Sequence, residues 1–158
     1  MSSPVQTARQ PEIARIADQL RRMYEGPAWH GPALKELLAD VTEEQAAARP
    51  IDNAHTIWEI VLHTSTWLRV ARERLSATQN RDPSEDENWP AVSGSWRDAL
   101  AALERDQGNL EQAVLSFPEE RLNDPAPGTE PQTFYILLHG AIQHIAYHAG
   151  QIALLKKS

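Results

Sequence analysis

The sequence predicts an all-α protein that folds as a four-helix bundle. Four long segments carry apolar residues at helical spacing, and no segment shows the alternating pattern of a β-strand. At 158 residues the chain is long enough to form one domain, 1–158, around a core of its own. A bundle is the natural packing for four such helices.

Short helical pieces separate the first two long helices. Apolar residues at helical spacing predict a helix over residues 12–24, which the proline- and glycine-rich stretch 26–32 interrupts. A short helical pattern resumes over 33–38. Thr42 then opens a short capped turn, and Thr56 begins a capping box that marks the start of the second long helix.

Long connections flank the third helix. Residues 79–94 are polar and acidic, so we expect an exposed connection from which Trp89 tucks back against the body. Ser95 resembles another N-terminal cap, and the helix after it should end near Pro118, before a loop over 119–131. Connections of this length exceed those of simple hairpins, so one of them can run the length of the bundle.

The last predicted helix runs from Thr133 to Lys157 and is apolar almost all round. A helix of this kind is expected to be buried or sandwiched. It carries His139, His144 and His148. The last two are four residues apart and lie roughly 40° from each other around the helix, so both rings can reach one ion. His139 points to the opposite side and cannot join them.

A third imidazole is available from His63, at the edge of the buried stripe of the second helix. Three protein ligands and an open position are the catalytic pattern for zinc, and imidazole also suits nickel and iron. The spacing of His144 and His148 does not indicate a zincin protease, because no glutamate stands where its general base should be. The alternative is that these are core histidines that bond to neighbouring side chains.

Composition excludes several classes of function. The formal net charge of −7 and the absence of a basic stripe argue against nucleic-acid and anionic-membrane binding. The chain has no cysteine, so any thiol chemistry needs a thiol from outside. The first ten residues lack the apolar run of a signal peptide, and no stretch suggests a membrane span. We therefore expect a cytoplasmic protein.

Two stretches, Ile57–Trp67 and Leu138–Ile152, resemble the DinB/YfiT-like family of metalloenzymes, the DinB superfamily. The resemblance implies an up-down-down-up bundle that is often a homodimer. It also implies a metal triad of one histidine from the second helix and two from the fourth, which here are His63, His144 and His148. Some members of the family are thiol-dependent transferases or isomerases that use low-molecular-weight thiols, and others are described as hydrolases.

These observations lead to three hypotheses. The first is a metal-dependent transferase that activates a low-molecular-weight thiol at the three histidines, and the second is a hydrolase that uses metal-bound water. The third is a non-catalytic, stress-related bundle protein. No residue stands out as a general base, so the catalytic residues stay open. Candidates to orient a ligand or to reach substrate are Gln151, on the face of the histidine pair, Tyr147 and His30.

Overall fold

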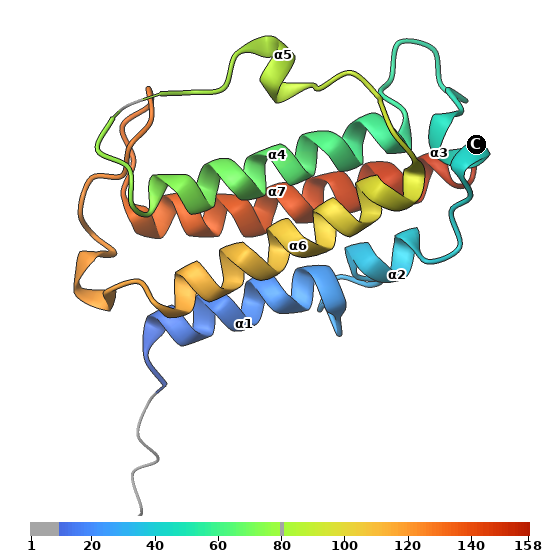
Figure 1. Cartoon of the computed structure of the whole chain (residues 1–158). Coiled ribbons are helices and arrows are strands. Elements are labelled where there is room, and N and C mark those ends of the chain that lie inside the picture. Colours follow the sequence, from blue (N-terminus) through green and yellow to red (C-terminus); the bar gives the residue numbers. More distant parts are fainter. Residues whose placement is uncertain (1–9, 80) are drawn as a thin grey trace, which may run out of the picture.

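The computed structural model of the protein describes residues 10–79 and 81–158. In these ranges four long helices lie side by side (Figure 1), namely α1 (Glu12–Glu25), α4 (Ile57–Arg74), α6 (Trp96–Leu115) and α7 (Phe134–Leu155). The same ranges contain no β-strand, only two isolated bridges. The all-α prediction is confirmed. Nine of the first ten residues, where the sequence indicates no signal peptide, lie outside the described ranges.

Each long helix packs against two others. Both α4 and α1 contact α6 and α7. In Figure 1, α1 and α7 run from left to right, whereas α4 and α6 run from right to left. Because α4 and α6 run the same way, the segment between them returns along the bundle beside α4 (Figure 1). The described parts of this crossover segment, residues 75–79 and 81–95, bring polar groups to the junction of α4 and α7.

Shorter helices interrupt the connections. Helices α2 (Leu34–Leu38) and α3 (Glu43–Ala47) lie between α1 and α4, α5 (Glu85–Asn88) lies in the crossover segment, and the 3₁₀ turn η1 (Glu119–Arg121) follows α6. Side-chain oxygens of the residues before α3, α4, α5, α6 and α7 accept hydrogen bonds from backbone N–H groups in the first turn. These capping residues are Thr42, Thr56, Ser84, Ser95 and Thr133. The predicted helix starts are confirmed, while α5 was not predicted.

The core is a layer of aliphatic side chains contributed by all four long helices. Its members with no exposed surface are Leu20, Val61, Leu103, Leu110, Val114, Leu138 and Ile152. One buried carboxylate interrupts this layer: Asp106 of α6 accepts a hydrogen bond from Ser65 of α4 and pairs with Arg69. Helix α4 contacts both α6 and α7, and most of its side chains are buried.

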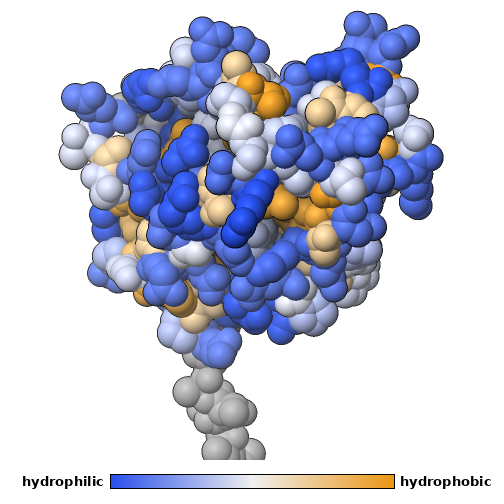
Figure 2. Space-filling view, turned by 45° about the vertical axis from the view of Figure 1, so that its right-hand side comes forward, coloured by the Kyte–Doolittle hydropathy of each residue, from blue (hydrophilic) through white to orange (hydrophobic). Residues whose placement is uncertain are grey.

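Helix α7 is not buried on every side, so that expectation was wrong. Ile136, Tyr147 and Leu154 are 56%, 66% and 65% exposed. The physical reason is that α7 packs against α1, α4 and the short α2, which leaves one side of it without a neighbour in the described chain. Figure 2 shows a largely hydrophilic face on which hydrophobic residues are visible in small groups. None of the helices in the described ranges is long and apolar enough to cross a membrane.

Candidate metal centre

Three histidines meet where α4 and α7 pack together. His63 extends from α4, and His144 and His148 extend from successive turns of α7. The Nε2 atom of His144 lies 3.0 Å from Nε2 of His63 and 2.9 Å from Nε2 of His148. One nitrogen from each ring lies within 4.8 Å of the other two, so the group could hold a metal ion. The spacing within α7 and the neighbouring position of α4 together produce this cluster.

Two of the rings are fixed through their other nitrogen. Nδ1 of His63 lies 2.8 Å from the backbone carbonyl oxygen of Asn88, and Nδ1 of His148 lies 2.6 Å from Oε1 of Gln151. A carbonyl oxygen can only accept a hydrogen bond, so both Nδ1 atoms carry the proton. In the neutral rings Nε2 therefore presents its lone pair to the centre of the cluster. Metal-binding histidines are commonly oriented in this way.

The cluster is neutral near pH 7. Desolvation, together with the neighbouring rings of His148 and His63, lowers the pKa of His144 to about 3. Desolvation also lowers the pKa of His148 to about 4 and shifts the pKa of His63 in the same direction. A protonated ring would have to keep its charge in a partly buried site. The uncharged form is the one that can donate its lone pair to a metal.

The donor set fits a divalent transition metal. Nε2 of His144 carries at most one hydrogen but faces two lone pairs, so hydrogen bonding leaves the cluster one donor short. A cation among the three nitrogens would satisfy all of them. With zinc–nitrogen bonds of about 2.1 Å in a tetrahedron, ligand nitrogens lie about 3.4 Å apart, which is a few tenths of an ångström beyond the two spacings from Nε2 of His144 to the other rings.

Two aromatic rings, Trp89 from the crossover segment and His55 from the loop before α4, stack over the cluster. Trp89 stacks on His63 with ring centroids 3.9 Å apart, and His55 stacks on Trp89 at 3.5 Å. The indole N–H of Trp67 donates to Oδ1 of Asn88 at 2.7 Å, which ties the end of α5 to α4. The expectation that Trp89 tucks back against the body is confirmed. The crossover segment thus supplies a hydrogen-bond acceptor, the carbonyl of Asn88, and the ring of Trp89 that stacks on His63.

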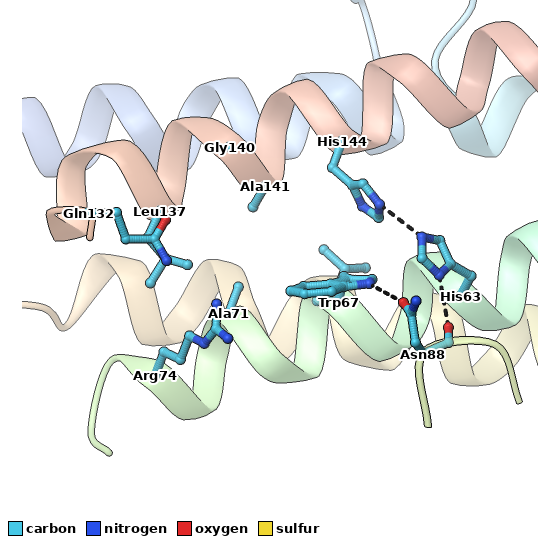
Figure 3. Close-up of a pocket in the computed structure, with 11 residues that line it drawn as sticks. His63, Trp67, Ala71, Arg74, Asn88, Gln132, Leu137, Gly140, Ala141 and His144 are labelled. Carbon is cyan, nitrogen blue, oxygen red and sulfur yellow. Dashed lines mark hydrogen bonds between the residues drawn. The ribbon is translucent and has the colours of Figure 1, made fainter. Parts of the chain in front are cut away.

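A cavity of about 380 Å³ extends from the cluster along the α4–α7 groove (Figure 3). Its walls are mostly apolar, with a few polar groups at the two ends. The lining residues are His63, Trp67, Leu68, Ala71, Arg74, Asn88, Gln132, Leu137, Gly140, Ala141 and His144. No carboxylate is among them. The cavity has the size and mixed lining of a small-molecule site, and the three-histidine cluster lies at one end of it.

The other candidates from the sequence have different positions. Gln151 contacts His148, as its place on the same helix face suggested. Tyr147 is exposed and does not line the cavity, although its ring lies 5.2 Å from that of His148. His30 is exposed and lines a separate depression beside Lys156. His139 stays out of the cluster and packs against Tyr135.

Sequence reasoning missed the groups that frame the cluster and cavity. Asn88 contributes a backbone carbonyl to the cluster, and a backbone group leaves no signal in residue type. Arg74 and Gln132 come from a helix end and a loop that only the packing of α4 on α7 brings together. The pattern Ser84 to Glu87 is a capping box like those used to find the longer helices, so α5 could have been found.

A four-helix bundle with three histidines converging between two of its helices defines a class of α-helical protein with a candidate metal centre. Residues 28–152 match the DinB superfamily, and the chain belongs to that family. A crystal structure of a conserved protein from Enterococcus faecalis is similar in fold, with a TM-score of 0.61 and 16% sequence identity. The match covers 92% of this chain and 91% of that one. No curated protein matches the sequence.

Proposed function

We propose that the protein is a metal-dependent transferase that activates a low-molecular-weight thiol at His63, His144 and His148. The observation that carries this proposal is the convergence of three neutral Nε2 atoms at the end of a cavity that can admit a small molecule. A divalent metal on three neutral ligands would keep its full charge and lower the pKa of a thiol or a water molecule that reaches it.

The chain's own residues prepare this site. The carbonyl of Asn88 and the amide of Gln151 hold two imidazoles in the tautomer that directs Nε2 inward. Trp89 lies flat on His63 and shields that ring from solvent. Leu68 and Leu137 line the cavity and can contact the apolar part of a bound reactant. The roles of these residues are thus to bind and orient the reactants.

The choice of a thiol rests on what surrounds the cluster. Among the described residues, no aspartate or glutamate lines the cavity, so these walls offer no carboxylate as a general base for water. A thiol needs less help, because its ordinary pKa of about 8.5 is already close to neutral. The chain has no cysteine that could compete for the metal or serve as the nucleophile. The thiol would therefore arrive as a cosubstrate.

The test is to mix metal-loaded protein with the electrophile monochlorobimane and one of a panel of thiols: glutathione, bacillithiol, mycothiol or a mercapto acid such as mercaptooctanoate. We expect faster conjugation with at least one thiol. Gly140→Leu is a useful variant, because a Cβ at that position meets no atom within 4 Å and the longer side chain would occupy the cavity. It should keep the metal and lose the acceleration. No acceleration with any thiol, at full metal loading, contradicts the proposal.

A hydrolase that acts on esters or amides with a water nucleophile is the second candidate, and the open side of the same cluster favours it. This activity would appear without any thiol and would depend on the metal. A third possibility, a non-catalytic bundle protein, predicts that His63→Ala lowers metal content and changes no reaction. A panel of simple esters and amides, assayed with and without metal, separates the hydrolase from the non-catalytic protein.

Zinc is the metal that we propose first, with nickel and iron as alternatives. Metal analysis of protein purified without an affinity tag identifies the ion. We also propose a cytoplasmic homodimer, for which the exposed Ile136, Tyr147 and Leu154 of α7 offer an apolar surface. Sedimentation at equilibrium, repeated on Leu154→Lys, tests the dimer.

A further inference from the structure

The end of the cavity opposite the histidines carries a buried cation. Figure 3 shows Arg74 and Gln132 at one end of the row of lining side chains and His63 and His144 at the other. Arg74 is only 6% exposed. It lies eleven residues after His63 on α4, which places the two Cα atoms about 16 Å apart along the helix. The cavity therefore joins two chemically different ends.

The hydrogen bonds of Arg74 leave part of its guanidinium available. Nη2 donates to the backbone oxygen of Arg81 and to the carboxylate of Asp82. Nε is buried and has no hydrogen-bond partner among the described residues. A guanidinium has five N–H donors, and the bonds of Arg74 to Arg81 and Asp82 use only those on Nη2. A buried donor without a partner is costly, which points to a ligand that supplies an acceptor.

The surroundings of Arg74 favour a singly charged acceptor. Asp82 is itself held by Thr129 and already balances the charge of the guanidinium. A doubly charged phosphate would therefore leave a larger uncompensated charge than a carboxylate would. Gln132 lines the same end, and the loop glycine Gly128 lies so close that an added Cβ would be 3.1 Å from Nε2 of Gln132 and 3.4 Å from Cζ of Arg74. This end is thus a confined polar site.

We infer that Arg74 and Gln132 bind the carboxylate of the thiol cosubstrate, whose sulfur lies at the histidine end. The inference rests on the proposed function and adds the chemical class of the cosubstrate: an elongated molecule with a thiol at one end, a carboxylate at the other and a largely apolar middle. The middle contacts Leu68, Ala71 and Leu137. Trp67 forms the wall between the two polar ends, as Figure 3 shows.

The experiment uses straight-chain acids with a terminal thiol, from mercaptopropionate through mercaptohexanoate and mercaptooctanoate to mercaptoundecanoate. Each is paired with the mercapto-alcohol of the same length. Binding to the cobalt-loaded protein is followed by the cobalt–sulfur absorption, and binding of octanoate and octanol to the metal-free protein by calorimetry. At one chain length we expect the acid to bind at least about tenfold more tightly than its alcohol. Octanoate should bind more tightly than octanol without metal.

Variants locate the effect. Arg74→Gln should reduce the difference in affinity between the acid and its alcohol to about twofold or less, and it should leave the affinity for the mercapto-alcohol unchanged. Because this variant also loses its pair with Asp82, Gln132→Glu provides an independent test, since it places a carboxylate at the same end. Arg72→Gln is the matched control, because Arg72 lies on the same helix outside this cavity. It should keep the full preference.

The possible failures are distinguishable. If no thiol produces cobalt–sulfur absorption, the proposed function fails, and the comparison of octanoate with octanol still tests the carboxylate site. If thiols bind but acids and alcohols of every length bind equally, the proposed function stands and the carboxylate site is wrong. Tighter binding of a mercaptoalkyl phosphate than of the matching carboxylate would also overturn the assignment to a carboxylate.

Discussion

Replacing Gln151 by methionine tests whether the groups behind the histidines control metal binding. Oε1 of Gln151 lies 2.6 Å from Nδ1 of His148, and the side chain is half-buried on the same helix. Methionine has a similar length and no strong acceptor, so His148 would lose the partner that fixes its tautomer. Loss of such an outer partner typically weakens metal affinity by about 10- to 100-fold, which corresponds to about 1.4–2.7 kcal/mol.

The assay is a competition titration of zinc against a chromophoric chelator. Gln143→Met is the matched control, because Gln143 is exposed on the same helix and is not one of the two residues that bond to the Nδ1 atoms of the cluster. It should bind zinc like the unmodified protein, whereas Gln151→Glu should bind more tightly, since a carboxylate makes the imidazole a stronger donor. Equal affinities for Gln151→Met and Gln143→Met would refute the reasoning.

Three further predictions concern the stability of the fold. Leu103→Ala removes a side chain with no exposed surface and should lower the free energy of unfolding by about 2–5 kcal/mol in urea titrations, whereas Leu115→Ala on the exposed side should cost far less. Asp106→Ala leaves the buried Ser65 hydroxyl without its acceptor, so the free energy of unfolding should fall by about 2 kcal/mol by the same measurement. A loss no larger than that of an exposed substitution would contradict the role of this pair. The metal-free protein should lose stability on acidification from about pH 7 to about pH 5, because the unfolded chain then binds protons that the buried histidines, with pKa values held below their usual 6.5, do not. The histidines thus make their full contribution to the free energy of unfolding at pH values above about 6.5, and that contribution is lost as the pH falls below this value. A urea midpoint independent of pH over this range would contradict the lowered pKa values.

Much of the fold could be predicted because its signals are local. The starts of α4, α6 and α7 are marked by Thr56, Ser95 and Thr133, whose hydroxyls accept from backbone groups three residues ahead. The spacing of His144 and His148 fixes their shared face, whatever the rest of the chain does. These features depend only on helix geometry, which is why the sequence suffices to find them.

What could not be predicted depends on packing between distant segments. The exposed side of α7, with Ile136 and Leu154, follows from the number of neighbours that this helix has, which its apolar composition does not reveal. The contact of Asn88 with His63 depends on where the crossover segment lies over α4. Arg74 looks like an ordinary basic residue at a helix end, and only the fold shows it to be buried.

The central claim is that three imidazoles from two helices bind one metal ion. Metal content and affinity, measured on protein purified without a tag and compared among the unmodified chain, His63→Ala, His148→Ala and His139→Ala, test it most directly. We expect about one divalent ion per chain, large losses of affinity in the first two variants and none in the third. Unchanged affinity in His63→Ala would contradict the claim, because it would show that α4 contributes no ligand.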